Sequence, residues 1–283
     1  MKTFLSYIRL ARLDKPIGIY LLLWPSMLGL MLGAVNEGYV NFENYLIVLT
    51  GAILVRSCGC VINDISDYKF DRLVKRTKDR PIASGEISLR KAWVFFIILS
   101  IASISLLLFT PPITIKLALF FSLLILFYPL AKRFIKAPQV VLGITFGSGS
   151  IISYSLQSDS FSLSLMILYI GLIAWIVSFD SIYALEDIDD DIKIGINSTP
   201  ILWGEKTIFI SNILHFIFYA AIVLIAYINS FSNFFTIIFC LLLIFFYLQT
   251  NLVKEGRYLE AFKFNNNVGI LLVVSFAIEI FLI

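Results

Sequence analysis

Acidic side chains recur at helical spacing after the second long apolar run of this sequence. Asp64, Asp67 and Asp71 stand at positions i, i+3 and i+7, and Asn63 directly precedes them. In a helix this spacing places the three carboxylates on one face, where like charges repel one another unless a cation lies between them. A cluster that offers only oxygen ligands favours a hard cation such as Mg²⁺. The spacing therefore predicts that all four residues bind magnesium.

A second acidic stretch repeats this pattern further along the chain. Its members at i, i+3, i+7 and i+11 are Asp180, Tyr183, Asp187 and Asp191. Asp187 and Asp191 follow Asp67 and Asp71 by an equal interval, about the length of a four-helix unit. The interval suggests two related halves of the chain that face each other across one site.

Basic residues accompany the two acidic clusters. Lys75, Arg76, Arg80 and Lys193 would neutralise the phosphate oxygens of a diphosphate that metal ions bridge between the clusters. A structural alternative is that the acids only solvate helix ends and pair with neighbouring Lys and Arg side chains.

Two further charges lie deep within apolar runs. Arg56 stands two helical turns before Asn63 on the same face, and Asp180 lies near the end of its run. A charge at membrane depth is costly unless it lines a wet cavity or meets a partner, so we expect both side chains to face the interior. A structural ion pair between Arg56 and Asp180 is the alternative. The lone His215 has no acidic neighbours, which favours a packing role.

The elements that must position these residues are membrane-spanning helices. The chain has 283 residues, of which 59% are hydrophobic and 14% are charged, whereas soluble domains are about 25% charged. A bilayer core of about 30 Å requires about 20 apolar residues per helix. We expect nine spans, at residues 16 to 34, 44 to 62, 92 to 110, 112 to 130, 138 to 156, 162 to 181, 207 to 227, 233 to 250 and 266 to 283. The runs are continuous and do not alternate, which predicts an all-helical membrane bundle in a single domain, 1–283, with no cleavable signal peptide.

The basic residues predict the orientation of the bundle. Lys and Arg concentrate in the N-terminal segment and in the loops that follow even-numbered spans. The positive-inside bias makes these segments cytoplasmic and, with nine spans, places the C-terminus outside. The net charge of +3 thus reflects topology and gives no sign of nucleic-acid binding.

The two motifs resemble those of the UbiA superfamily of intramembrane prenyltransferases. Asn63, Asp64, Asp67 and Asp71 match its pattern N-D-x-x-D-x-x-x-D, and the second cluster matches its D-x-x-x-D. Longer blocks are similar to the 4-hydroxybenzoate polyprenyltransferases of ubiquinone biosynthesis. They lie at 12 to 25, 56 to 88, 128 to 143 and 181 to 199, and the resemblance covers essentially the whole chain.

The resemblance implies a nine-helix fold with two pseudo-related halves plus a ninth helix, and a reaction. A polyprenyl group would pass from polyprenyl diphosphate to the ring carbon ortho to the hydroxyl of 4-hydroxybenzoate, in a bacterial inner membrane with a periplasmic C-terminus. Asp67, Asp71, Asp187 and Asp191 would be catalytic through Mg²⁺. Arg133 matches a family arginine associated with substrate binding, and Arg56 is the candidate for the aromatic carboxylate because arginine suits a bidentate contact.

Two alternatives remain open from the sequence. Sister families act on naphthoate, haem, chlorophyllide or lipid acceptors and keep the same aspartates. A secondary transporter would also contain pseudo-repeats and intramembrane charges, but its site should lie near the midplane on interrupted helices. The acids of this chain lie at one membrane face, which disfavours transport.

Overall fold

The structure is a computed structural model that describes residues 2–39, 41–74 and 77–282. All regular elements in these ranges are helices. The twelve α-helices are α1 (Lys2–Leu10), α2 (Ile17–Glu37), α3 (Phe42–Asp71), α4 (Leu89–Leu106), α5 (Pro112–Phe134), α6 (Pro138–Tyr154), α7 (Leu163–Ala184), α8 (Ile188–Ile194), α9 (Thr199–Trp203), α10 (Thr207–Ile228), α11 (Phe234–Lys254) and α12 (Tyr258–Leu282). Three single 3-10 turns complete them: η1 (Leu107–Phe109), η2 (Leu185–Asp187) and η3 (Gly204–Lys206).

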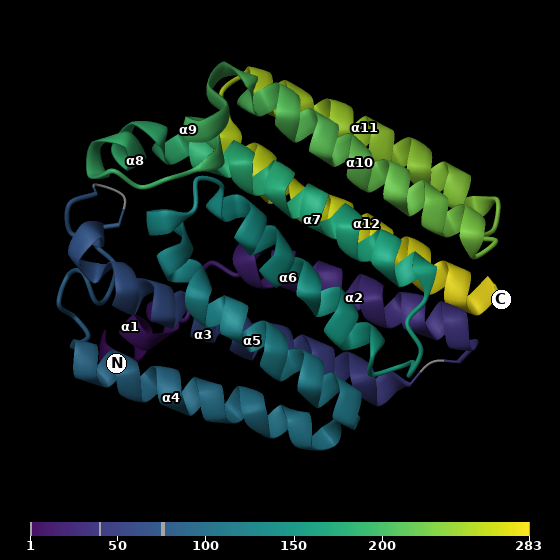
Figure 1. Ribbon diagram of the computed structural model, residues 1–283, viewed down its shortest axis with the longest axis horizontal. Helices are drawn as coiled ribbons and strands as arrows, with labels where there is room; N and C mark the ends of the chain where they lie inside the picture. Colours follow the sequence, from purple (N-terminus) through teal and green to yellow (C-terminus); the bar gives the residue numbers. More distant parts are fainter. Residues whose placement is uncertain (1, 40, 75–76, 283) are drawn as a thin grey trace.

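The long helices run side by side along the longest axis of the molecule (Figure 1). Each of the nine predicted spans overlaps one of them. Seven are long and apolar enough to cross a membrane, whereas α5 has only a shorter apolar stretch, Pro112–Tyr128, and α6 has 17 residues. The all-helical membrane fold is therefore confirmed, while the count of nine crossings, the two related halves and the single domain stay predictions.

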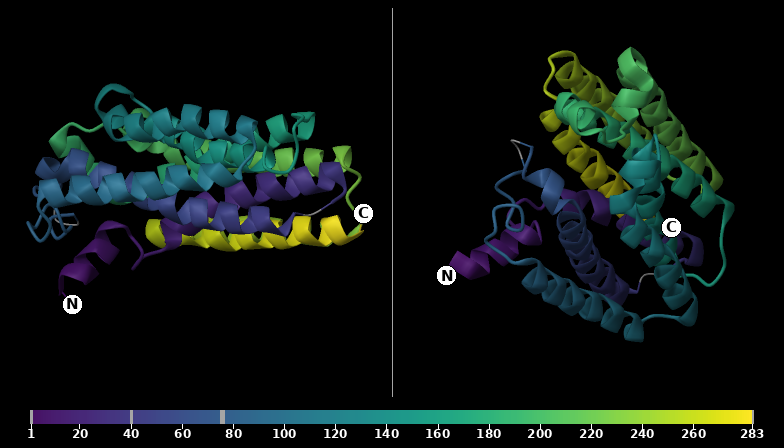
Figure 2. Two further views of the ribbon diagram at one scale, coloured as in Figure 1. Left: turned by 90° about the horizontal axis from the view of Figure 1, so that it is seen from below. Right: turned by 60° about the vertical axis from the view of Figure 1, so that its left-hand side comes forward.

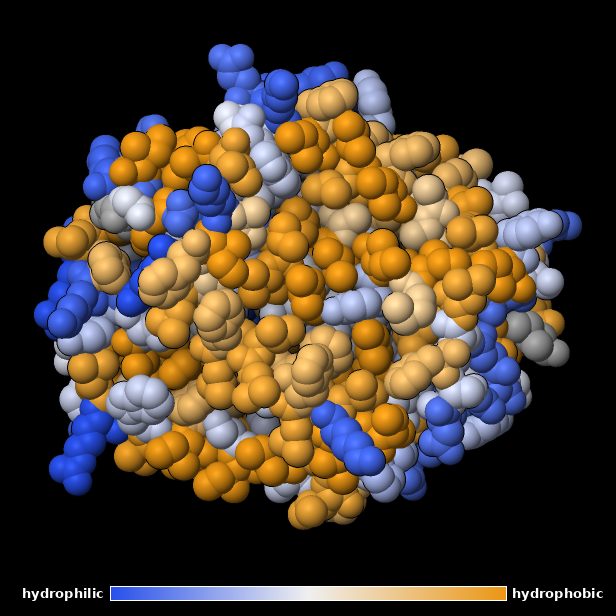
Figure 3. Space-filling model, viewed as in Figure 1, coloured by the Kyte–Doolittle hydropathy of each residue, from blue (hydrophilic) through white to orange (hydrophobic). Residues whose placement is uncertain are grey.

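The outer surface of the bundle matches a membrane environment. In α4 only Ala92 is buried among the helix's side chains, and large apolar residues such as Ile101 and Ile104 are exposed. Figure 3 shows hydrophobic side chains over most of one face, with hydrophilic ones gathered toward its ends. These apolar helices indicate an integral membrane protein, because exposing so large an apolar area to water is unfavourable.

The core is built from aromatic stacking and close helix contacts. The ring of Trp175 on α7 stacks on Phe218 of α10, with centroids 4.8 Å apart. Gly29 of α2 packs directly on the backbone of Ser150 of α6, where an added Cβ would lie 2.1 Å from the Ser150 carbonyl oxygen. Small residues commonly allow such close approach between membrane helices. His215 is 2% exposed and packs against aromatic rings, which confirms its predicted packing role.

Both acidic stretches lie at one end of the bundle. This end carries α1, α8, α9 and the segment that connects α3 to α4, whereas α12 ends at the opposite end (Figures 1 and 2). Ser88 caps α4 by accepting a hydrogen bond from the backbone N–H of Lys91. The α3–α4 segment packs Ile82 and Ile87 against Val61 and Leu10. This small second core fixes the segment over the end of α3.

Candidate active site

The first acidic cluster lies on one face of the last turns of α3. This helix continues past the apolar run to Asp71, as the spacing predicts. Asp64, Asp67 and Asp71 are 1%, 2% and 7% exposed, which is unusual because ionised carboxylates are rarely buried without partners. Asn63, which directly precedes Asp64, lines a large cavity beside this cluster.

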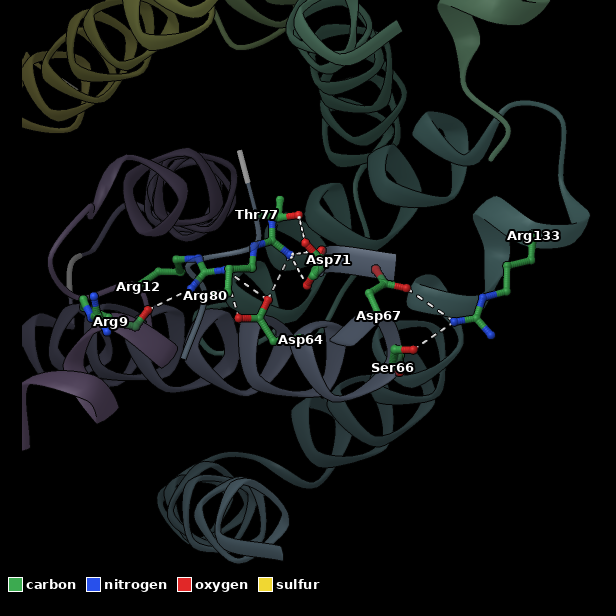
Figure 4. Close-up of polar contacts among 9 residues, drawn as sticks. All are labelled: Arg9, Arg12, Asp64, Ser66, Asp67, Asp71, Thr77, Arg80 and Arg133. Atoms are coloured by element: carbon green, nitrogen blue, oxygen red, sulfur yellow. Dashed lines mark hydrogen bonds and ion pairs between the residues drawn. The ribbon is translucent and has the colours of Figure 1, made fainter. Parts of the chain in front are cut away.

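Two guanidinium groups compensate the buried charges of Asp64 and Asp71 (Figure 4). Arg12 donates from Nη2 to both carboxylate oxygens of Asp64, at 3.0 Å each. Arg80 donates from Nη1 to Asp64 at 3.2 Å and to Asp71 at 3.1 and 2.9 Å. Each of these two carboxylates is therefore paired with at least one guanidinium group.

The segment after α3 brings Arg80 back over the helix end. Thr77 donates its hydroxyl to the Asp71 carbonyl at 2.9 Å, and Arg72 donates from Nε to the Ala83 carbonyl at 2.9 Å. Burial alone would lower the pKa of Arg80, but the charges of Asp64 and Asp71 outweigh it and the pKa is raised. Arg80 thus remains a cation at every physiological pH.

A third arginine comes from the end of α5. Arg133 donates from Nη2 to the Ser66 carbonyl at 2.9 Å, and its Nη2 lies 3.4 Å from the Asp67 carboxylate. Its guanidinium also lies over the ring of Phe70, 5.1 Å from the centroid. The structure therefore brings Arg133 to the first cluster, close to Asp67.

The second acidic cluster has a different local structure from the one predicted. The sequence favours one continuous helix through Asp191, but α7 ends at Ala184 and the turn η2 separates it from α8. The expected i+7 and i+11 register of Asp187 and Asp191 is therefore wrong. Five acids crowd residues 186–191, and a change of helical pitch spreads like charges that a continuous helix would stack.

One large cavity nevertheless joins the two clusters. Its volume is about 1440 Å³, and Asn63, Asp64, Asp187 and Asp191 line it, whereas Asp67 and Asp71 are not among its lining residues. The cavity continues between the helices along apolar residues such as Phe121 and Leu142. Residues of both acidic clusters, Asn63 and Asp64 from the first and Asp187 and Asp191 from the second, thus line one space with a polar mouth and an apolar interior.

The predicted deep charges also line this cavity. Arg56 and Asp180 are among the lining residues, together with Tyr128 and Tyr183. Asp180 and Arg56 interact electrostatically, but no direct ion pair joins them among the described side chains. The guanidinium of Arg56 lies over the ring of Phe146, 5.3 Å from the centroid, and its Nε is buried without a hydrogen-bond partner.

One predicted basic residue, Lys193, is not brought to the cavity. Lys193 on α8 is 72% exposed and pairs with Asp190 at 3.4 Å. A phosphate role for Lys193 is therefore not supported by its position, because the short helix α8 turns it toward solvent. Lys75 and Arg76 lie outside the described residues.

Arg12 is the site residue that the sequence analysis missed. It contacts Asp64 from 52 positions away in the chain, and no helical spacing connects the two. Its only sequence signal is its position in the basic segment before the first apolar run.

Comparisons with known proteins match this architecture. The model of the UbiA prenyltransferase family matches residues 22–271. A 4-hydroxybenzoate octaprenyltransferase from Vesicomyosocius okutanii is 36% identical over 272 residues, which cover 95% of this chain and 99% of that protein. The solved apo structure of a UbiA homologue from Aeropyrum pernix K1 has a TM-score of 0.80 at 24% identity, covering 92% of this chain and 97% of that one.

A solved structure of a UbiA homologue from Archaeoglobus fulgidus, bound to GPP and Mg²⁺, has a TM-score of 0.73 at 18% identity. It covers 97% of this chain and 99% of that one. This likeness concerns the fold, while the family model and the octaprenyltransferase relative extend over nearly the whole sequence. The chain therefore belongs to the UbiA prenyltransferase family.

Proposed function

We propose that this protein transfers a polyprenyl group from polyprenyl diphosphate to 4-hydroxybenzoate. The new carbon–carbon bond forms at the ring carbon ortho to the hydroxyl, the allylic carbon–oxygen bond breaks, and its electron pair leaves with pyrophosphate. The ring then loses the proton that the prenyl group replaces. The octaprenyltransferase relative supports this acceptor, and the reaction belongs to ubiquinone biosynthesis.

One observation carries the proposal. The polar mouth of one cavity is lined by residues of both acidic clusters, Asn63 and Asp64 from the first and Asp187 and Asp191 from the second, and the cavity continues into an apolar interior. A diphosphate head needs cations at such a mouth, whereas an isoprenoid tail needs apolar walls. An amphipathic substrate of this kind fits both parts of the cavity at once.

The donor set fits magnesium. Asn63, Asp67 and Asp71 on one side and Asp187 and Asp191 on the other offer only oxygen ligands. Asp64 is also predicted as a ligand from the sequence, but its oxygens accept hydrogen bonds from Arg12 and Arg80. In the part of the chain that the structure describes, no three carboxylate, thiol or imidazole groups converge around one point. Mg²⁺ commonly binds through one or two carboxylates plus substrate phosphate oxygens, so two separate carboxylate groups facing a diphosphate suit it. When bound, the metal would stabilise the negative charge that develops on the leaving pyrophosphate.

The protein's own cations act on the same leaving group. Arg80 stands between Asp64 and Asp71, whose carboxylates favour its charged form, and Arg133 lies beside Asp67. Each can donate to phosphate oxygens that the metal ions do not reach. We include Lys75 and Arg76 in this role as sequence-based predictions.

The acceptor side of the site is assigned to Arg56 and Asp180. Arg56 is a half-buried cation in the cavity wall, where its charge would meet the carboxylate of an aromatic acid. The Phe146 ring beneath its guanidinium provides an aromatic surface beside that carboxylate. Asp180 and Tyr183 lie in the same wall and would orient the ring toward the diphosphate.

The proposed setting is a bacterial inner membrane. The basic segments around the site predict that this end of the bundle faces the cytoplasm, where the diphosphate substrate is available, and that the C-terminus is periplasmic. The bilayer would deliver the polyprenyl tail laterally.

Mass spectrometry of the reaction tests the proposal directly. Purified protein in nanodiscs receives 4-hydroxybenzoate, Mg²⁺ and prenyl diphosphates of several lengths, and the expected product has the combined mass of both substrates minus pyrophosphate. Asp67→Asn and Asp187→Asn should each reduce product formation by at least about 100-fold, since both remove a ligand that acts in the transition state. Asp159→Asn, at the opposite end of the bundle, is the matched control with expected wild-type turnover.

Metal removal completes the test. EDTA should abolish pyrophosphate release, and added Mg²⁺ should restore it. Product with naphthoate but none with 4-hydroxybenzoate would replace the proposed acceptor while keeping the reaction class. Release of pyrophosphate that survives both aspartate substitutions would contradict the enzyme proposal.

A further inference from the structure

Among the described side chains Asp71 accepts hydrogen bonds from Arg80 alone, through both of its oxygens, whereas Asp64 contacts two guanidinium groups. Both oxygens of Asp64 accept hydrogen bonds from Arg12, and Oδ1 also accepts one from Arg80. Only 1% of the residue is exposed. These three hydrogen bonds use most of the roughly four acceptor sites of a carboxylate, so Asp64 has little capacity left for a metal ion. Its contacts instead hold two cations at the mouth of the cavity.

Arg12 itself is held in an unusual backbone conformation. Its φ is 58°, in the left-handed region that residues other than glycine rarely adopt. Besides the Asp64 contact, its Nη1 donates to the Arg9 carbonyl at 2.8 Å. A conformation of this kind persists only where the surroundings fix it, and such residues cluster at functional sites. Arg12 also lines the cavity, as do Asp64 and Arg80.

Arg80 needs a carboxylate partner other than Asp71 to keep its position when Asp71 binds a metal ion. Its described contacts with Asp64 and Asp71 both use Nη1, so one guanidinium nitrogen is shared between two carboxylates. If Asp71 turns to a metal ion, Arg80 keeps its attachment to Asp64. Arg12 and Arg80 then carry two positive charges, and Asp64 carries one negative charge. The remaining positive charge favours an anionic ligand.

We propose that Asp64 is a positioning residue that aims Arg12 and Arg80 at the diphosphate of the substrate, and that Arg12 is a further diphosphate-binding residue. This inference rests on the proposed function, because it assigns the diphosphate head to this mouth of the cavity. It separates Asp64 in role from Asp67 and Asp71, which stay the proposed metal ligands.

A binding experiment without turnover tests the proposal. The probe is an unreactive prenyl S-thiolodiphosphate, and its Kd is measured by calorimetry on purified protein at saturating Mg²⁺. Arg12→Ala and Asp64→Asn should each raise this Kd by about 10- to 100-fold, the loss expected for hydrogen bonds to a charged group. The Mg²⁺ concentration for half-maximal probe binding should change by less than about twofold. Asp67→Asn should show the reverse pattern, with a large increase in the Mg²⁺ requirement.

The coupling between the two residues provides a second readout. If Asp64 acts through Arg12, Asp64→Asn should cost less in an Arg12→Ala background than in the wild type. Arg12→Gln keeps an N–H donor for Asp64 and serves in place of Arg12→Ala if the latter does not yield monodisperse protein. Its Kd should also rise, because the positive charge is lost.

A control separates diphosphate binding from the attachment of α1. Glu86 of the α3–α4 segment contacts Ser6 and Arg9 of α1. Glu86→Gln weakens this contact and leaves Arg12 unchanged, so the Kd of this variant for the probe should equal that of the wild type. An equal rise in Kd for Glu86→Gln and Arg12→Ala would overturn the proposal, since the effect would then belong to α1. So would an Asp64→Asn variant that changes only the Mg²⁺ requirement. A wild-type protein that binds the probe but never prenylates 4-hydroxybenzoate would refute the proposed acceptor and leave this inference intact.

Discussion

The guanidinium of Arg56 packs directly on the backbone of Gly18. A Cβ at position 18 would lie 2.7 Å from both Nε and Nη2 of Arg56. Only glycine therefore leaves room for Arg56 where α2 begins beside α3. Both residues line the cavity, so a side chain at position 18 changes the direction of the proposed carboxylate-binding group.

The first prediction follows from this contact. Gly18→Ala should displace the Arg56 guanidinium and raise the KM for 4-hydroxybenzoate by about tenfold, equivalent to about 1.4 kcal/mol, while the KM for the prenyl diphosphate stays within about twofold. Steady-state kinetics with each substrate varied in turn measures both values. In Gly51→Ala the added Cβ meets nothing within 4 Å, so the acceptor KM should be unchanged. An unaltered acceptor KM in Gly18→Ala would show that the contact does not position Arg56.

The second prediction concerns Arg56 itself. Arg56→Ala removes a hydrogen bond to a charged group worth about 1.5–3 kcal/mol, so the KM for 4-hydroxybenzoate should rise by about 10- to 100-fold. Arg56→Lys should recover only part of this loss, because an ammonium does not reproduce the bidentate fork. The same two-substrate kinetics apply. A larger effect on the prenyl diphosphate than on the aromatic acid would refute the assignment.

The third prediction concerns the hydrogen bond that joins α7 to α12. Trp175 donates its indole N–H to Asn265 Oδ1 at 2.8 Å, and Asn265 is fully buried. Asn265→Leu leaves the indole N–H without this acceptor and should lower the free energy of unfolding by about 1–3 kcal/mol. Thermal unfolding in detergent measures the loss. Asn251→Leu, a matched change on α11, should cost less because Asn251 is only partly buried.

The fourth prediction is a pH dependence in the attachment of α1. Glu86 accepts a hydrogen bond from Ser6 at 2.7 Å and forms an ion pair with Arg9. The Arg9 hydrogen bond lowers the pKa of Glu86 below its ordinary value. A lowered folded-state pKa means that the contribution is present above the unfolded-state pKa and is lost as the pH falls through the folded-state pKa.

Hydrogen exchange of the α1 amides measures this effect. Protection should fall as Glu86 becomes protonated, by up to about 1 kcal/mol for a partly exposed pair. Glu86→Gln should show the low protection at every pH. If the protection of the α1 amides falls as steeply with decreasing pH in Glu86→Gln as in the wild type, the pH dependence belongs to another titratable group.

Periodicity and composition alone fixed much of the architecture. The apolar runs predict helices at the correct places because backbone polar groups in a membrane must be satisfied within each helix, whatever the neighbours are. The same local rule placed Asp64, Asp67 and Asp71 on one face of α3, since a helix converts spacing into direction. It failed at Asp187, where the turn η2 breaks the register.

Only the tertiary structure decided which charges meet. Arg12 reaches Asp64, and Arg133 reaches Asp67, from segments that share no periodic relationship with α3. Gly18 is required by Arg56 through a contact between two helices. Such contacts depend on how helices pack and where the connecting segments turn, and these are set by the shapes of many side chains together. The sequence therefore determined the membrane helices and the acids they carry, and the fold determined which cations and neighbours complete the site.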